Sequence, residues 1–478
     1  MDNKFYITTP IYYVNDKPHI GHAYTTIAAD VLARWRDGQG EDVVFSTGVD
    51  ENAQKTVEAA AKHNEDIHAY TDRMAEIWES TWGKLGISYT DFIRTTEDRH
   101  VVVVNEFWKR LEAAGDIYKG TYEGFYCVAC ETFYKEDDLT PEGLCKIHKT
   151  KPEWVSEENY YFALSKYQKP LLDFYAAHEE FVAPANRFNE MKSFVEHGLE
   201  DVSFSREKKP WGIPVPDDPE QVIYVWADAL VNYITVMGGI EGWEAHPADI
   251  HMMAKDIVRF HAILWPAMLM SAGLPLPGQI VVSGFLTING EKISKTIGNV
   301  IDPMDVAARY GVDALRYFLL REVPFGEDGD FSEVKMKERY NGDLANGLGN
   351  FSARILALAE KEELKSGQLD SAFDLEIQKM RQAAYAKTKD YKFHDALAAI
   401  WVAISFGDRY LNNEAVWAIK DDAARCEKLF NLISLLDNVA AVLLPYLPES
   451  SRKITAAIQW EGDTLHAKRI EPLFPRSV

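Results

Sequence analysis

The first 110 residues alternate short apolar runs with helical patterns, and this alternation limits the fold more than any other feature of the sequence. Residues 4–11 and 42–46 have the composition of buried strands, and residues 23–36 form a helical pattern with one apolar face. A second helical stretch begins near Ala53. This strand–helix–strand rhythm is typical of an α/β fold with a doubly wound parallel sheet, whose ligand lies at the carboxyl ends of the strands.

The chain has 478 residues, which is too long for one hydrophobic core. The rhythm breaks near residue 118 and resumes with strands expected at 222–226, 250–253 and 280–282. We therefore expect five segments: the first half of a Rossmann-like catalytic domain (1–117), a connective insertion (118–221), the second half of that domain (222–300), a linking helical segment (301–340) and an all-helical bundle (341–478).

Helical periodicity dominates the last segment. In the linking segment before it, Asp302-Pro303 predicts the start of a helix, as an N-cap followed by proline at the first helical position. Further helices are expected over residues 353–363, 375–389, 393–411 and 424–444, with Pro445 and Pro448 ending the last of them.

Two polar stretches about 270 residues apart carry the chemistry. Residues 18–22 (Pro-His-Ile-Gly-His) join the first strand to the first helix, where a phosphate is readily bound. Residues 292–296 (Lys-Ile-Ser-Lys-Thr) follow another apolar run, on a loop that Gly284, Asn289 and Gly290 are expected to make mobile. Surface histidines and solvated lysines explain either stretch alone. Together they predict a site that holds a nucleoside triphosphate during attack at its α-phosphate.

Three of the four cysteines lie in a second cluster. Cys127 and Cys130 are separated by two residues, as are Cys145 and His148, and 14 residues lie between the two pairs. Four ligands at this spacing predict one closed, structural Zn²⁺ site. The fourth cysteine, Cys426, is expected to be a small buried apolar residue.

The net charge of −23 argues against a general nucleic-acid coat protein. The charge is uneven, because residues 341–478 carry 17 Lys and Arg against 19 Asp and Glu, which leaves −21 for residues 1–340. The nearly neutral last segment can therefore offer a basic face to RNA. No apolar run reaches 18 residues and the chain enters a strand at once, so we expect no membrane span or targeting peptide and a cytoplasmic location.

Beyond these patterns, the sequence resembles the class I aminoacyl-tRNA synthetases, in particular their methionyl branch. His19-Ile20-Gly21-His22 and Lys292–Thr296 are similar to the HIGH and KMSKS signatures of the class. The resemblance continues through residues 9–15, 224–229, 255–261, 265–268 and 346–350 to Arg354, and so covers nearly the whole chain.

The resemblance implies ATP-dependent activation of L-methionine to methionyl-adenylate, and its transfer to the 3′ end of initiator and elongator methionine tRNAs. It implies that Mg²⁺ accompanies the ATP. By resemblance the catalytic residues are His19, His22, Lys292 and Lys295, and the ATP site also includes Gly21, Gly284 and Ser294.

The family's methionine pocket corresponds to Ile11, Tyr13, Asp50, Trp226, Tyr233, His261 and Leu264. Asp50 would hold the α-amino group, Trp226 and Leu264 would enclose the side chain, and Tyr233 and His261 would approach the thioether sulfur. The chain departs from the family at Asn52, where the usual Asp-Glu-His-Gly stretch has histidine.

The resemblance also gives roles to the other two segments. The zinc ligands Cys127, Cys130, Cys145 and His148 match the one-zinc type, whose metal braces the insertion near the acceptor end of the tRNA. In the C-terminal segment, which corresponds to an anticodon-binding domain, Asn350, Arg354 and Trp417 correspond to the residues that read and stack anticodon bases. Val416 replaces the proline usual before that tryptophan.

Three other interpretations stay open at this point. Class I synthetases for valine, isoleucine or leucine carry a much larger editing insertion, and one for cysteine needs metal ligands in its substrate pocket. A small-molecule nucleotidyltransferase leaves the helical bundle and Trp417 without a role, and a non-catalytic tRNA-binding protein has no need of the signature histidines and lysines. Because the sequence has no appended module after the bundle, we expect a monomer.

Overall fold

The computed structural model describes residues 3–128, 132–147, 149–207, 211–292 and 300–476. By internal packing the chain divides into two compact units. The first, here called the sheet unit, comprises Met1–Pro18, Gly40–Gly83 and Ser88–Ser283. The second, here called the helical unit, comprises His19–Gln39, Lys84–Ile87 and Gly284–Val478.

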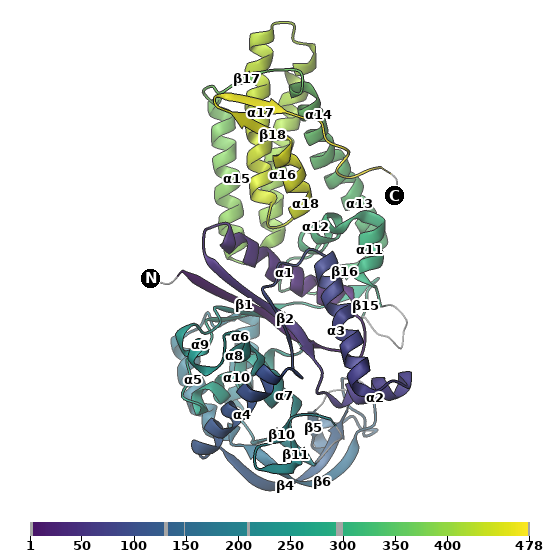
Figure 1. Cartoon of the computed structure of the whole chain (residues 1–478), viewed down its shortest axis with the longest axis vertical. Helices are drawn as coiled ribbons and strands as arrows, with labels where there is room; N and C mark the ends of the chain where they lie inside the picture. Colours follow the sequence, from purple (N-terminus) through teal and green to yellow (C-terminus); the bar gives the residue numbers. More distant parts are fainter. Residues whose placement is uncertain (1–2, 129–131, 148, 208–210, 293–299, 477–478) are drawn as a thin grey trace. The chain divides into compact units, whose positions relative to one another are not determined.

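A six-stranded sheet in the order β3-β2-β1-β12-β13-β7 is the centre of the sheet unit (Figure 1). Every pairing in it is parallel, which confirms the α/β class expected from the sequence. The strands are β1 (Lys4–Tyr13), β2 (Asp42–Asp50), β3 (Asp91–Arg94), β7 (Val182–Ala183), β12 (Ile250–Ala254) and β13 (Gln279–Ser283). The chain order reverses beside β1, and ligands of such sheets bind at the carboxyl end of this switch point.

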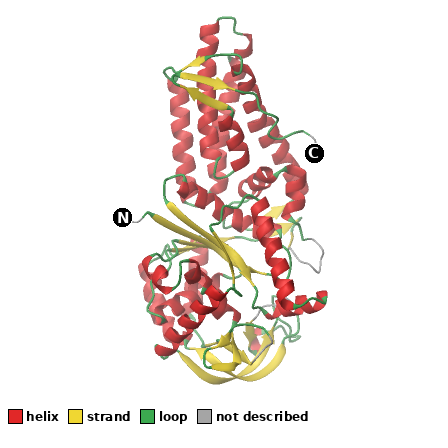
Figure 2. Ribbon diagram, viewed as in Figure 1, coloured by secondary structure: helices red, strands yellow, loops and turns green. Residues whose placement is uncertain are grey.

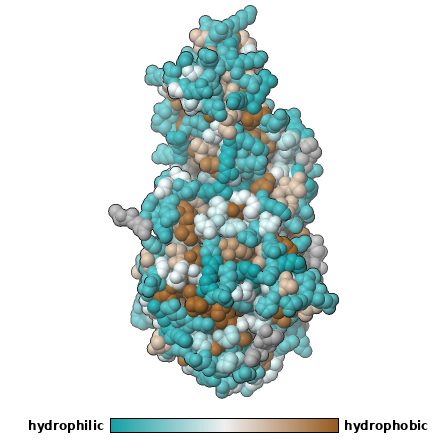
Figure 3. Space-filling view, in the orientation of Figure 1, coloured by the Kyte–Doolittle hydropathy of each residue, from teal (hydrophilic) through white to brown (hydrophobic). Residues whose placement is uncertain are grey.

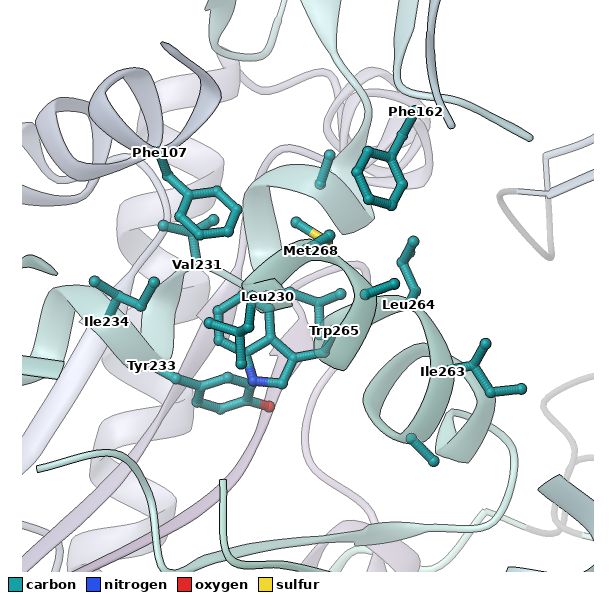
Figure 4. Close-up of a cluster of buried hydrophobic side chains, with 14 of the residues drawn as sticks. Phe107, Phe162, Leu230, Val231, Tyr233, Ile234, Ile263, Leu264, Trp265 and Met268 are labelled. Atoms are coloured by element: carbon teal, nitrogen blue, oxygen red, sulfur yellow. The ribbon is translucent and has the colours of Figure 1, made fainter. Parts of the chain in front are cut away.

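Helices and one continuous apolar cluster complete the packing of this sheet. The helices are α2 (Gln54–His63), α3 (Ile67–Lys84), α4 (Asp98–Ala113), α5 (Gln168–Ala177), α6 (Ala185–Glu196), α7 (Val225–Ala229), α8 (Asn232–Val236), α9 (Ile240–Ala245), a π-helical turn (Phe260–Leu264) and α10 (Trp265–Ser271). Figure 4 shows part of the cluster, in which Tyr233 and Leu264 lie among side chains such as Trp265 and Phe107. Two residues of the expected methionine pocket therefore belong to the core of the unit.

Two smaller antiparallel sheets are formed by strands that lie between β3 and β12 in the chain. The first has the order β5-β4-β6-β8, and the second β10-β11-β9. Their strands are β4 (Ile117–Cys127), β5 (Thr132–Tyr134), β6 (Glu153–Phe162), β8 (Val202–Ser203), β9 (Ser205–Glu207), β10 (Pro214–Val215) and β11 (Asp218–Ile223). The strand expected over 222–226 is therefore wrong in place and partner: β11 ends at Ile223, its neighbours are antiparallel, and Trp226 lies in α7. A short apolar run does not by itself distinguish a strand from a buried helical turn.

Long helices make up most of the helical unit, as Figure 2 shows by the extent of red ribbon. They are α1 (Ile20–Asp37), α11 (Pro303–Tyr310), α12 (Val312–Glu322), α13 (Glu333–Arg339), a π-helical stretch (Tyr340–Gly349), α14 (Asn350–Ala359), α15 (Ser371–Lys389), α16 (Phe393–Asn413), α17 (Asp422–Leu443) and α18 (Pro448–Ala456). The expected cap of α11 is present, because the Asp302 carboxylate accepts a hydrogen bond from the Met304 amide at 2.8 Å. The face of the bundle in Figure 3 is mostly hydrophilic, as expected of helices with one apolar face turned inward.

The expectation of an all-helical C-terminal segment is wrong in one respect. β17 (Leu364–Lys365), β18 (Ile458–Glu461) and β19 (Thr464–Ala467) form a small antiparallel sheet in that segment. Strands of two to four residues leave too little periodicity to be read from sequence. Cys426 also differs from its expectation, since it is half-buried and its thiol donates to Glu362 Oε2 at 3.6 Å.

A buried ion pair fixes α1 within the helical unit. The Arg316 and Asp30 side chains are both fully buried, and Arg316 Nη2 donates to Asp30 Oδ2 at 2.6 Å. Arg316 also donates to the Tyr446 carbonyl at 2.9 Å, and Asp30 accepts from Arg34 Nε at 2.8 Å. Since α1 begins directly after His19, this pair holds the helix on which the first signature is built.

Among the residues that the structure describes, no helix combines the length and the apolar character needed to cross a bilayer.

Replacing Arg316 with methionine should lower the free energy of unfolding by about 3–5 kcal/mol, because Asp30 then stays buried with a weaker set of partners. The matched control is Arg309→Met on α11, whose side chain is 51% exposed and whose pair with Glu333 should contribute no more than about 1 kcal/mol. Urea denaturation followed by circular dichroism measures both losses. Equal losses in the two variants would contradict the importance given to the buried pair.

Candidate active site

The carboxyl end of β1 presents two of the expected pocket residues on the same face. The pairing of β1 with β2 shifts register between Thr8 and Ile11, where Pro10 has no N–H to donate to a ladder. Beyond that shift Ile11 and Tyr13 are half-buried, while Tyr12 between them is buried and stacks on Trp78 with ring centroids 4.9 Å apart. Alternation along the strand thus turns Ile11 and Tyr13 together away from Trp78.

Asp50 lies beside Tyr13, because the two residues are register partners at the ends of β2 and β1. Asp50 is only 3% exposed, and its Oδ1 accepts a hydrogen bond from the Asn52 backbone N–H at 3.2 Å. A carboxylate at the end of a parallel strand is suited to hold an ammonium group.

Trp226 forms an aromatic wall with residues from other elements. Its indole stacks on the Phe260 ring with centroids 3.8 Å apart and planes within 5°. The centroid of the indole lies 6.5 Å from that of the Tyr13 ring and 6.2 Å from that of the His261 ring, and both rings are nearly perpendicular to the indole. The indole Nε1 is buried and has no hydrogen-bond partner among the described residues. Two other expected pocket residues, Tyr13 and His261, therefore lie around this indole.

The Tyr233 hydroxyl and the His261 imidazole form a hydrogen bond with each other. His261 lies on the π-helical turn, a feature often found at functional sites, and its Nδ1 is 3.1 Å from the Ile257 carbonyl. A carbonyl only accepts, so Nδ1 carries the proton and Nε2 accepts from the Tyr233 hydroxyl at 2.7 Å. Burial lowers the pKa of His261 to about 4 and raises the pKa of Tyr233, so both groups are neutral near pH 7.

The neutral pair leaves a pocket wall that suits an apolar group. Both ring nitrogens of His261 and the hydroxyl proton of Tyr233 are engaged within the protein. Leu264, three residues after His261, is 4% exposed and joins the same buried cluster. An unbranched thioether can pack against such a wall without leaving a buried polar group unpaired, whereas a side chain with several hydrogen-bonding groups cannot.

Several residues around this pocket were not expected from the sequence. Phe260 stacks on Trp226, and the Lys55 ammonium lies 3.3 Å from the centroid of the Tyr13 ring. A hydrogen-bonded group that joins Asn52, Asp228 and His100 lies beside Asp50. The only signal for it in the sequence was that asparagine stands at position 52, where the family usually has histidine. Asn52 and Asp228 are 176 positions apart, and His100 and Asp228 are 128 positions apart, so no local pattern relates them.

The first signature lies at the start of α1, in the helical unit. His19 is the N-cap, and its Nδ1 accepts a hydrogen bond from the Gly21 amide at 3.1 Å. The His22 Nδ1 accepts from the His19 amide at 3.2 Å, and the two rings stack at 3.6 Å. Since both Nδ1 atoms accept, a neutral ring in either position carries its proton on Nε2. The two histidines thereby form a reciprocal cap at the start of α1.

The second signature follows a hairpin. β14 (Leu286–Ile288) pairs with β15 (Glu291–Lys292) through Asn289 and Gly290, whose φ angles of 51° and 81° fit a tight two-residue turn. A Cβ on Gly284 would lie 1.9 Å from the Glu327 carbonyl oxygen, so glycine is needed there for close packing. These residues form defined structure where the sequence predicted a mobile loop, and Lys292 ends a strand. Ser294 and Lys295 lie outside the described residues, as does the side chain of Lys292.

Half of the predicted zinc site is described. Cys127 ends β4 and is 1% exposed, and Cys145 follows in a loop and is fully buried. Cys130 and His148 lie outside the described residues, and the residues that the structure does describe contain no cluster of three or more ligand-type side chains. Two buried thiols, one at the end of β4 and one in a loop, fit the soft ligand set that Zn²⁺ prefers.

The expected anticodon residues lie on α14 (Asn350 and Arg354) and on the short helical turn that follows α16 (Trp417). The Arg354 guanidinium is 5.4 Å from the centroid of the Trp417 ring, and it donates to Asp408 at 3.0 Å and to Asn412 at 2.8 Å. The Trp417 residue is 51% exposed, while Val416 before it is fully buried. Asn350 is exposed one turn before Arg354 on α14. The structure therefore brings Arg354 and Trp417 together, and Asn350 lies on the same helix as Arg354.

Comparison with known proteins decides the family. A family model described as tRNA synthetases class I (M) matches residues 5–142 and 137–356. A methionine–tRNA ligase of Thermotoga maritima is 44% identical, and the match covers 96% of this chain and 76% of the relative. The chain belongs to the methionyl-tRNA synthetases of class I.

Other relatives give the same result. The methionine–tRNA ligase of Thermosynechococcus vestitus is 44% identical, with 95% of this chain and 90% of the relative covered. The solved structure of Mycobacterium tuberculosis methionyl-tRNA synthetase in complex with methionyl-adenylate is 39% identical and has a TM-score of 0.91. That match covers 95% of this chain and 93% of the other. The resemblance read from the sequence is thus confirmed at the level of the methionyl-tRNA synthetase family.

The buried imidazole of His261 predicts a dependence of stability on pH. Because its pKa falls from 6.5 to about 4 on folding, the unfolded chain binds more protons between these values, and stability is lost as the pH falls through this window. Relative to neutral pH, the wild type should lose about 2 kcal/mol more than His261→Gln at pH 5. Urea denaturation at the two pH values measures the difference.

The exposed histidine His178, in the same unit, provides the control. His178→Gln should keep the pH dependence of the wild type. If His261→Gln kept it as well, the neutral buried state of His261 would be wrong.

Proposed function

We propose that this chain activates L-methionine with ATP to methionyl-adenylate and transfers the methionyl group to the 3′ end of initiator and elongator methionine tRNAs. The observation that carries the proposal is the group of side chains gathered beside the ends of β1 and β2. There, Asp50 stands next to an aromatic wall in which Tyr233 and His261 satisfy each other. An amino acid with an ammonium group at one end and an apolar thioether at the other matches both ends of this pocket. The names of the relatives and the adenylate complex of the Mycobacterium tuberculosis enzyme support the same assignment.

In the proposed reaction each pocket residue has one task. Asp50 holds the α-amino group, and Ile11, Tyr13, Trp226 and Leu264 enclose the side chain, while Tyr233 and His261 form the wall against the sulfur. The methionine carboxylate then attacks the α-phosphorus of ATP and pyrophosphate leaves. Fixing the carboxylate in place removes much of the entropic cost of this two-substrate step.

The two signatures supply charge stabilisation for the same step. Nε2–H groups of His19 and His22 donate to phosphate oxygens, and Gly21 allows close approach of the triphosphate; the Nδ1 contacts within the cap support this tautomer. Lys292, Ser294 and Lys295 hold the departing pyrophosphate, and Gly284 belongs to the same nucleotide site. When bound with ATP, Mg²⁺ neutralises part of the triphosphate charge. In the second step a terminal ribose hydroxyl of the tRNA attacks the methionyl carbonyl and AMP leaves.

The remaining segments serve the tRNA. Cys127, Cys130, Cys145 and His148 hold one structural Zn²⁺, and the buried thiols of Cys127 and Cys145 support this ligand set. The metal braces the connective insertion at 118–221, between the catalytic halves at 1–117 and 222–300. Residues 301–340 link this catalytic part to the anticodon-binding segment at 341–478. We further propose a cytoplasmic monomer.

Asn350, Arg354 and Trp417 bind the unstacked anticodon bases. The half-exposed Trp417 indole beside the Arg354 guanidinium supports this role, because exposed aromatic rings and planar cations are the usual stacking partners of single-stranded bases.

Amino-acid-dependent exchange of pyrophosphate into ATP tests the first step. Across the twenty standard amino acids, methionine should stimulate exchange most strongly, because only its side chain combines the length and the apolar thioether that the pocket accepts. Stimulation that is greatest with any other amino acid would overturn the assignment.

Replacing Trp417 with alanine should reduce tRNA charging about 5- to 150-fold while leaving exchange within about twofold, since stacking contributes about 1–3 kcal/mol for each base. Trp460→Ala is the matched control, because this tryptophan lies in the same unit and is 46% exposed. It should leave both rates unchanged. A parallel loss of charging and exchange in Trp417→Ala would instead assign the residue a structural role.

A further inference from the structure

We infer that Asn52, together with Asp228 and His100, positions the two ends of the methionine pocket relative to each other; the inference rests on the proposed function. Asn52 makes contacts in two directions. Its backbone N–H donates to Asp50 Oδ1 at 3.2 Å. Its side-chain Nδ2 donates to Asp228 Oδ2 at 2.7 Å and to the Thr95 carbonyl at 3.3 Å. One residue thus links the carboxylate proposed to hold the amino group to a buried carboxylate on another element.

Asp228 extends this link into the core. The residue is fully buried, and its Oδ1 lies 2.7 Å from His100 Nε2. His100 is also fully buried, and its Nδ1 lies 2.9 Å from Thr235 Oγ1. The carboxylate is therefore shared between an amide on one side and an imidazole on the other, and the chain of hydrogen bonds runs from Asp50 to Thr235.

The elements at the ends of this chain carry the pocket. Asp228 shares the five-residue helix α7 with Trp226, and Thr235 shares α8 with Tyr233. Asp50 ends β2, where it is the register partner of Tyr13. A shift of Asn52 would therefore move the site of the amino group relative to the aromatic wall. No residue of the hydrogen-bond chain belongs to either signature, so its effect should fall on methionine rather than on ATP.

The chemistry at position 52 also explains which side chains can replace asparagine. The amide presents two N–H groups from one nitrogen and uses them for Asp228 and Thr95. Histidine, the residue usual at this place in the family, brings an N–H donor for the Asp228 carboxylate. Aspartate would set a second carboxylate against Asp228, and alanine would leave Asp228 Oδ2 without its Asn52 donor in a buried place.

Steady-state exchange kinetics on the full chain test the inference. Asn52→Ala should raise KM for methionine about tenfold, which is the effect of losing one hydrogen bond to a buried charged group, while KM for ATP stays within about twofold. Asn52→Asp should raise KM for methionine more than Asn52→Ala does. Asn52→His should return KM for methionine to within about threefold of the wild type. Thr235→Val, which keeps the side-chain volume at the far end, should raise KM for methionine about threefold.

Asn159→Ala is the control, because this asparagine also lies in the sheet unit but is on β6, outside the hydrogen-bond chain, and is more deeply buried than Asn52. It should leave both KM values unchanged. The inference is overturned if Asn52→Ala leaves KM for methionine unchanged, raises both KM values alike, or is not rescued by histidine. Should Asn52→Ala not fold, an unchanged KM for methionine in Thr235→Val, or a tenfold rise in Asn52→His, would overturn it equally. Wild-type protein without methionine-dependent exchange would refute the proposed function itself.

Discussion

Parallel pairing of β1 with β2 is the constraint on which the pocket depends. It makes Tyr13 and Asp50 register partners at the edge where ligands of doubly wound sheets bind. The register shift between Thr8 and Ile11 then sets which side chains of β1 face the pocket. If the strands paired without this shift, Ile11 and Tyr13 would turn to the opposite face and Tyr12 would lose its stack on Trp78, since side chains alternate along a strand.

Protonation states in both units follow from hydrogen-bond geometry. His19 and His22 each accept at Nδ1, whereas His261 donates from Nδ1 and accepts at Nε2. The first pair is therefore arranged to donate to an oxyanion, and the second ring is arranged to have both nitrogens engaged. In the proposed function the same side chain therefore has two roles, charge stabilisation at His19 and His22 and an apolar wall at His261. The difference lies in which backbone group each Nδ1 meets and in how deeply the ring is buried.

Much of this could be predicted from the sequence, because the relevant signals are local. The parallel sheet, the N-cap at Asp302 and the long helices follow from periodicity and capping residues. The family resemblance pointed to Tyr13, Trp226 and His261, which the structure brings together.

What the sequence did not reveal depends on pairing between distant residues. The short strand β17 pairs with β19, about 100 positions away, and β18 and β19 form a hairpin in which each strand has four residues. Too few residues take part to leave a periodic signal. Trp226 was expected on a strand because a short buried helix and a buried strand have similar composition. The link from Asn52 through Asp228 to His100 likewise joins residues that no local pattern relates.

The central claim is that one chain both selects methionine and attaches it to tRNA. The most direct measurement supplies the full chain with ATP, Mg²⁺, all twenty amino acids at equal concentration and a mixture of tRNAs, and identifies the aminoacyl group released from the tRNA by mass spectrometry. The account predicts methionine alone, bound to methionine tRNAs. Another amino acid in the product, or methionine attached without regard to the anticodon, would contradict it.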